Sequence, residues 1–188
     1  MFKPAPMMMI FFALSAAATA QNSRFTIFAG YSYANTPIAT SQRSNLNGWE
    51  GSIEGFRYRP WLTLIADGSG HYGWNEFPIS CVTVPVCTPA VPNVRVNEYN
   101  LLGGPQFSKF RGKFRIFAHG MGGATHVTVR TSGFFDSSTA WAIATGGGAD
   151  YKWRGPFSWR LQADYMRTNV FKTGQNMIRA STGLVIRF

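Results

Sequence analysis

The chain has 188 residues and a formal net charge of +10, with 15% aromatic but only 14% charged residues. A soluble secreted domain usually keeps about a quarter of its residues charged, so the composition argues against a surface that meets only water. The length suffices for one domain with a core.

The first twenty residues are predicted to be a cleaved signal peptide. Lys3 precedes an apolar run over 7–14, and Ala18-Thr19-Ala20 offers a small-x-small cleavage site. The alternative, a membrane anchor, is disfavoured because about 14 apolar or small residues are too few to span a bilayer as a helix. The mature domain would be 21–188. For an exported chain, the basic charge suits anionic lipid or lipopolysaccharide better than nucleic acid.

Apolar and polar residues alternate with a period of two in eight segments, which is the pattern of strands. The predicted strands are 24–33, 48–58, 61–72, 94–107, 113–127, 139–153, 157–166 and 175–188. The clearest is 157–166, in which Phe157, Trp159 and Leu161 begin a series of outward residues. Arg160, Gln162 and Asp164 fall on the opposite face.

The connections between these strands alternate in length. Tight turns are predicted near Pro60, Gly112 and Gly155, and longer loops at 35–47, 73–93, 130–138 and 169–174. This arrangement predicts an all-β fold, a closed antiparallel up-and-down eight-stranded transmembrane β-barrel with short periplasmic turns and long external loops. A sheet in lipid must close on itself, because every backbone donor and acceptor has to be paired within the protein.

Aromatic residues gather beside the predicted tight turns, as in an interfacial girdle. They are Trp61, Phe107, Phe110, Phe114, Trp153, Phe157 and Trp159. The alternative is a soluble barrel or sandwich with its apolar face inside. A water-facing surface has no need of large aromatics banded at one end of its strands, so the membrane barrel is favoured.

Ionisable residues fall on the face opposite the apolar one, which would be the lumen. This predicted charge network comprises Glu50, Glu54, Asp67, His71, Glu98, Arg115, His119, Asp150, Lys152, Arg160, Asp164, Arg179 and Arg187. An eight-stranded barrel is only wide enough for side chains to fill it, and buried charges need partners. We therefore expect a plugged lumen. A narrow pore for small solutes remains the alternative.

The segments RFTIFAGYSYA, NEYNLLGGPQFS and GLVIRF resemble the small eight-stranded outer-membrane barrels, the OmpA-like and OmpX-like group. The resemblance covers essentially all of the mature chain. It implies the outer membrane of a Gram-negative bacterium and a role in envelope integrity or in adhesion through the external loops. It also implies that Leu184, Ile186 and Phe188 form the C-terminal signal read by the barrel-assembly machinery. Nothing follows Phe188, so a peptidoglycan-binding domain is not implied.

The remaining chemistry is sparse. Cys81 and Cys87 are predicted to form a disulfide in an oxidising compartment, and the loop that they close is the best candidate contact region. A metal pair there would lack a histidine or a third thiol. Lipid A deacylase barrels use a His-x-Ser arrangement, whereas the residues two after the three histidines are Gly73, Met121 and Thr128.

We therefore expect a protein that is not an enzyme, although a lipid A-modifying barrel enzyme is a second alternative. No cofactor, metal or nucleic acid is expected. The expected partners are outer-membrane lipid and lipopolysaccharide, the assembly machinery and a ligand of the external loops. A closed barrel has no free edge, so a monomer is expected.

Overall fold

The computed structural model describes residues 25–39, 42–76, 93–131, 134–170 and 174–188. Its strands are β1 (Thr26–Ala39), β2 (Gln42–Arg59), β3 (Leu62–Glu76), β4 (Asn93–Arg111), β5 (Phe114–Thr131), β6 (Phe134–Arg154), β7 (Phe157–Thr168) and β8 (Gln175–Arg187). The predicted signal peptide and the predicted disulfide lie outside the described residues. No helix in the described part of the chain is long and apolar enough to cross a membrane.

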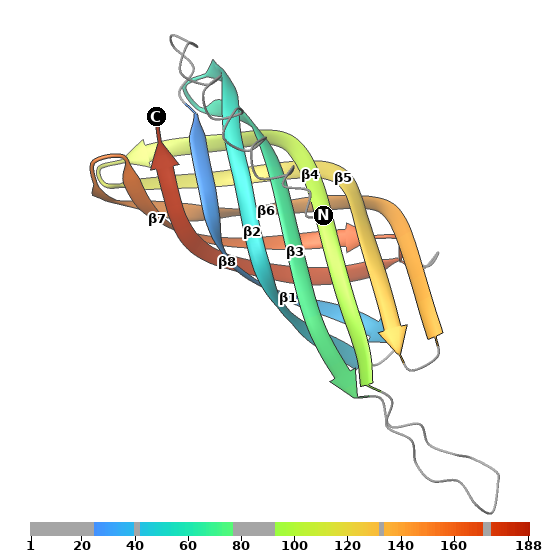
Figure 1. The fold of residues 1–188 in the computed structure, drawn as a ribbon. Coiled ribbons are helices and arrows are strands. Elements are labelled where there is room, and N and C mark those ends of the chain that lie inside the picture. Colours follow the sequence, from blue (N-terminus) through green and yellow to red (C-terminus); the bar gives the residue numbers. More distant parts are fainter. Residues whose placement is uncertain (1–24, 40–41, 77–92, 132–133, 171–173) are drawn as a thin grey trace, which may run out of the picture.

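The eight strands form one closed barrel, which confirms the predicted fold class. Each strand pairs antiparallel with the next in sequence, and β8 closes the ring against β1. Figure 1 shows these two strands side by side. Ile27 faces Ile186 across this seam, and the Phe188 amide donates to the Phe25 carbonyl at 3.0 Å. Every strand therefore has two neighbours, and no described strand presents an open edge.

Three tight turns define what we call the turn end of the barrel. Arg111 pairs with Phe114 and Arg154 with Phe157, so each of these hairpins has a two-residue loop. Gly112 and Gly155 occupy the first loop position with φ of 60° and 57°. A type II′ turn requires a left-handed residue at that position, which explains the glycines.

The opposite end, which we call the loop end, shows where the predicted boundaries were wrong. Much of the predicted loops 35–47 and 130–138 is strand, because β1 and β2 pair as far as Ala39 and Gln42, and β5 and β6 as far as Thr131 and Phe134. In these extensions the alternation inverts: Leu46 points inward while Asn45 points outward. A strand that leaves lipid for water reverses its apolar face, and the sequence pattern was read only for apolar residues pointing outward.

The outer wall carries an aliphatic band between two aromatic belts. Along β7 the outward residues run Phe157, Trp159, Leu161, Ala163 and Tyr165, and Leu161 is 62% exposed. Six of the seven predicted girdle residues at the turn end are exposed on this wall. The prediction was wrong for Phe110, which pairs with the inward-facing Arg115 and lines the mouth of the interior. A second belt, which the sequence analysis did not identify, lies toward the loop end and contains Tyr31, Trp49, Tyr72, Tyr99, Trp141 and Tyr165. Two belts around an apolar band are typical of membrane barrels.

Candidate functional site in the barrel interior

The interior near the turn end holds a cluster of opposite charges, the turn-end cluster. Arg160 donates to Asp150 at 2.7 Å and to Glu54 at 2.6 Å. Arg115 donates to the other oxygen of Glu54 at 2.6 Å and to Asp150 at 3.3 Å, and Arg187 also binds Asp150. Three guanidinium groups thus share two carboxylates, and these five side chains cross-link five strands, β2 and β5 to β8, through the lumen.

Two aromatic rings flank the buried Arg160. Its guanidinium carbon lies 5.0 Å from the centroid of the Phe28 ring and 4.4 Å from that of Phe117. Such cation–π contacts stabilise a cation that has lost its water. Gly148 makes room for this arrangement, because a Cβ there would lie 2.8 Å from the Phe117 ring.

A second group of charges, the central cluster, surrounds Arg179 further inside. Arg179 donates to Asp164 at 2.6 and 3.0 Å and to Asp67 at 2.8 Å, and its Nε lies 3.3 Å from Glu50. His119 Nε2 lies 2.8 Å from the other oxygen of Asp164. One guanidinium is therefore held by three carboxylates, so this cluster is richer in negative charge than the turn-end cluster.

Other interior polar groups form hydrogen bonds beside the central cluster. Ser32 Oγ lies 2.9 Å from His71 Nε2 and donates to Glu50 at 3.3 Å, while Glu98 accepts from Asn100 at 3.0 Å. In a catalytic triad the acid binds the histidine and orients it toward the serine. Here the acid binds the serine, and His71 Nδ1 has no hydrogen-bond partner among the described residues. The arrangement is that of a packed polar interior.

Apolar side chains occupy the interior toward the loop end. Ala34, Leu46, Val96, Val127 and Val170 form a buried cluster that we call the apolar cap. A second apolar cluster contains Met121, Met166 and Met177. Thr36 donates to the Met177 sulfur at 3.2 Å, so this cluster meets polar interior groups directly. The described interior thus changes from paired charges at the turn end to hydrocarbon at the loop end.

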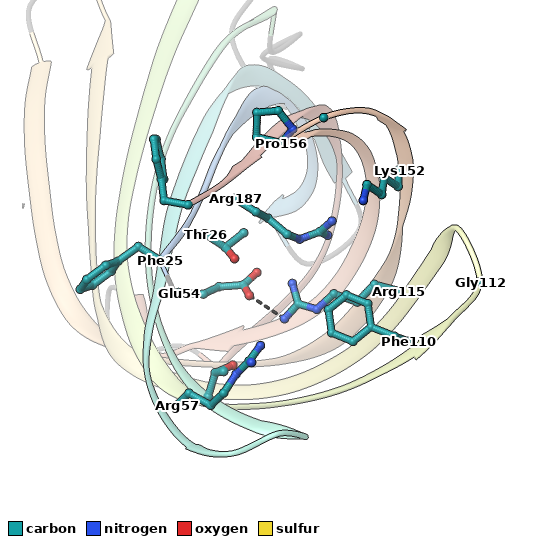
Figure 2. A pocket seen from close by; sticks show the side chains of 13 residues that line it. Phe25, Thr26, Glu54, Arg57, Phe110, Gly112, Arg115, Lys152, Pro156 and Arg187 are labelled. Carbon is teal, nitrogen blue, oxygen red and sulfur yellow. Dashed lines mark hydrogen bonds and ion pairs between the residues drawn. The ribbon is translucent and has the colours of Figure 1, made fainter. Parts of the chain in front are cut away.

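A cavity of about 380 Å³ opens at the turn end. Figure 2 shows Glu54, Arg115 and Arg187 pointing toward the middle of this mouth, with the ion pair between Glu54 and Arg115 at its floor. Arg57 and Lys152 also line it. The mouth is therefore cationic and could receive a small anion, but it stops at the turn-end cluster.

The structure brings most residues of the predicted charge network together. Those that are buried in the interior are Glu50, Glu54, Asp67, His71, Glu98, Arg115, His119, Asp150, Arg160, Asp164 and Arg179. Arg187 is partly buried at the mouth. Lys152 is on the inward-facing side of β6, as predicted, but it lies close to the turn. Its side chain is therefore exposed at the mouth and forms no ion pair with another described residue. Among the described residues, no group of three or more His, Cys, Asp or Glu could hold a metal ion.

Sequence reasoning missed several interior partners. Gln162 donates to Glu50 at 2.9 Å and to Asp164 at 3.0 Å, and Phe28 and Phe117 flank Arg160. The alternation had placed Gln162 on the inward face without assigning it a partner. Phe28 and Phe117 also lie on inward-facing positions, so the alternation could have placed them inside as well. The predicted C-terminal signal residues lie on the outer face of β8, with Phe188 70% exposed.

The chain is similar in structure to two bacterial surface proteins. Neisserial surface protein A matches with a TM-score of 0.66 at 11% identity, over 87% of this chain and 97% of that one. Ail, the attachment invasion locus protein of Yersinia pestis, in complex with the heparin analogue sucrose octasulfate, matches with a TM-score of 0.59 at 15% identity. That match covers 88% of this chain and all of Ail.

No protein-family model matches the chain, and no curated protein matches it in sequence. Identities this low carry information about the fold alone. The chain therefore has the fold of the small eight-stranded outer-membrane β-barrels, as the resemblance of its strand segments predicted.

Proposed function

We propose that this chain is a monomeric, non-enzymatic outer-membrane barrel whose lumen is plugged by its own side chains. Its role would lie at the cell surface, in envelope integrity or in adhesion through the external loops. The observation that carries the proposal is the distribution of side chains across the wall: hydrocarbon and aromatics outside, interlocked ion pairs inside.

The outer wall supports insertion into a membrane. Leu161 in the aliphatic band and Trp159 in the aromatic belt at the turn end would each lose roughly 1.5–3 kcal/mol of burial energy if water covered them. In the proposed orientation the turn end faces the periplasm and the loop end faces outward. Export would depend on a cleaved signal peptide over 1–20, and assembly on the terminal residues Leu184, Ile186 and Phe188. The predicted Cys81–Cys87 disulfide would then lie in an external loop.

The interior supports a plug. Arg160 and Arg179 are completely buried, and each is bound by carboxylates from other strands. Removing a partner from a buried pair costs about 3–5 kcal/mol, so opening a path through these clusters is unfavourable. Beyond them an ion would still have to cross the apolar cap, where Leu46 and Val170 are buried.

The two structural neighbours support a surface role. One is called an attachment invasion protein and the other a surface protein. Loops on a rigid scaffold commonly carry recognition. If this chain acts likewise, bacteria that display it should adhere to host cells better than bacteria without it, or should resist detergents better. Equal adherence and equal detergent sensitivity would contradict the surface role.

Conductance and gel migration on one sample test the plugged barrel. The protein, refolded in detergent, should migrate differently before and after boiling, and should show no discrete current steps in a planar bilayer. Steps whose size changes in Glu54→Gln would instead establish the narrow pore. Lipid A of unchanged mass in cells with and without the protein is expected, and a changed mass would establish the enzyme.

A further inference from the structure

Four outward side chains form a continuous row at the loop end. Trp74 on β3 pairs in register with Arg95 on β4, Arg95 with Arg130 on β5, and Arg130 with Phe135 on β6. All four side chains are exposed on the outer wall, Trp74 by 65% and Phe135 by 60%. We call this row the arginine row. It consists of two adjacent cations with an aromatic ring on either side.

No carboxylate among the described side chains neutralises the two arginines. Like charges directly opposite each other on neighbouring strands are destabilising. Neither Arg95 nor Arg130 forms an ion pair within the part of the chain that the structure describes. The Arg95 guanidinium instead lies 4.0 Å from the Trp74 ring centroid, and that of Arg130 4.9 Å from the centroid of Phe135. The rings support each cation from the side, and no hydrogen bond to another described residue uses its donors, so they can bind an external anion.

The surface beside the row suits a sugar. A cavity of about 270 Å³ is lined by Tyr72, Gly73, Trp74, Arg95 and Asn97. The neighbouring row toward the membrane presents Asn97, Thr128 and Ser137 in register, which supply amide and hydroxyl groups. Guanidinium groups recognise phosphate oxygens with paired donors, while hydroxyls and amides hydrogen-bond to sugars.

The position of the row selects the ligand, given the orientation proposed above. Tyr72 and Tyr99 belong to the aromatic belt at the loop end, and belts of this kind sit at the membrane interface. Trp74 lies two residues beyond Tyr72 along β3, which is roughly 7 Å in a strand. The row therefore lies on the wall at the depth of the outer-leaflet headgroups, where a lipid can reach it from the side.

We propose that the arginine row binds the phosphorylated sugar headgroup of lipopolysaccharide. Arg95 and Arg130 bind a phosphate together, and the adjacent polar cavity receives the sugar ring. The bound anion removes the repulsion between the two cations. The assignment rests on the outer-membrane orientation of the proposed function, and it adds a specific lipid site on β3 to β6.

The chain offers a matched control on the same end of the barrel. Arg43 is also exposed, but its guanidinium donates to the Asn35 side chain, to the Asn35 carbonyl at 3.1 Å and to the Asn176 carbonyl at 3.4 Å. Its donors are already used within the protein. Replacing it removes the same charge from the loop end without touching the row.

The test measures binding of purified lipopolysaccharide to the full folded chain in detergent. One cation at an anionic surface contributes about fivefold in affinity, so Arg95→Gln should weaken binding about fivefold and the Arg95→Gln, Arg130→Gln pair about 25-fold. Arg43→Gln should change it less than twofold. Chemically dephosphorylated lipopolysaccharide should bind weakly and equally to the parent and to the double variant.

Several results would overturn the site. The double variant could bind lipopolysaccharide as tightly as the parent, or Arg43→Gln could weaken binding as much as Arg95→Gln. Phosphatidylglycerol or heparin binding more tightly than lipopolysaccharide would assign the row to a phospholipid or to a sulfated polysaccharide instead. Gel migration and conductance of the same batch separate the two proposals. A folded, silent barrel with unchanged binding refutes only the row, whereas discrete current steps refute the plug.

Discussion

Glu54→Gln is the sharpest perturbation of the charged interior. The side chain is 2% exposed, and its two oxygens accept from Arg160 and from Arg115, each at 2.6 Å. Glutamine keeps the shape and removes the charge. It would also turn an amide donor toward one of the two guanidinium groups. The buried Arg115 and Arg160 and the partly buried Arg187 would then share the single carboxylate of Asp150.

The magnitude follows from that imbalance. Removing one partner from a buried charge pair costs about 3–5 kcal/mol, because an uncompensated charge stays behind. Arg160→Met should cost less, since two arginines and two carboxylates would remain. Its main loss would be the contacts with Phe28 and Phe117, each about 0.5–2 kcal/mol. The double variant should cost less than the sum of the single variants, by about 1–3 kcal/mol.

Urea unfolding in lipid vesicles, followed by tryptophan fluorescence, measures these free energies. Asp136→Asn is the control, because that carboxylate lies near the loop end and forms no ion pair with another described residue. It should change the free energy of unfolding by less than about 0.5 kcal/mol. A cost below about 1 kcal/mol for Glu54→Gln, or costs that simply add in the double variant, would refute the interlocked interior.

Three further variants test the packing and the assembly signal. Gly148→Val should lower the free energy of unfolding by about 1–3 kcal/mol because its side chain would collide with the Leu161 carbonyl and with the Phe117 ring, whereas Gly120→Val, with nothing within 4 Å of a Cβ, should be tolerated. Equal effects in urea unfolding would argue against the collision. Leu46→Ala in the apolar cap should cost about 2–5 kcal/mol in the same assay, and a cost near zero would show that the cap is loose. Phe188→Ala should lower the free energy of unfolding by no more than about 3 kcal/mol, the burial energy of one lipid-facing ring, yet should strongly reduce the amount of folded barrel in isolated outer membranes. An unchanged amount would remove the assembly role.

The sequence predicted the wall better than the interior contacts. Alternation along β7 predicted which residues face outward, because side chains in a strand must alternate. It also predicted that Arg160 and Asp164 face inward. Alternation tells which face of the strand a side chain is on, but not how far along the barrel axis it lies. The separation of the turn-end cluster from the central cluster therefore needed the register of all eight strands.

The loop end was predicted least well, for a physical reason. Residues such as Asn45 and Arg130 are polar and point outward, so a pattern that expects an apolar outer face mistakes a strand in water for a loop. The inversion itself, with Leu46 and Val96 inward, marks where the wall leaves the membrane. The arginine row could not be found from sequence spacing. Its four residues, from Trp74 to Phe135, line up only through the pairing of four strands.

Collision of probes with spin labels on β7 tests most directly which medium surrounds the barrel. Single cysteines at Leu161, Ala163 and Tyr165, in a chain whose own Cys81 and Cys87 are replaced by serine, place labels only on the outer face. Reconstituted in lipid vesicles, all three labels should collide readily with dissolved oxygen and poorly with a water-soluble nickel reagent. Labels shielded from both reagents would mean that this face is a packed interior, and the membrane barrel would be contradicted.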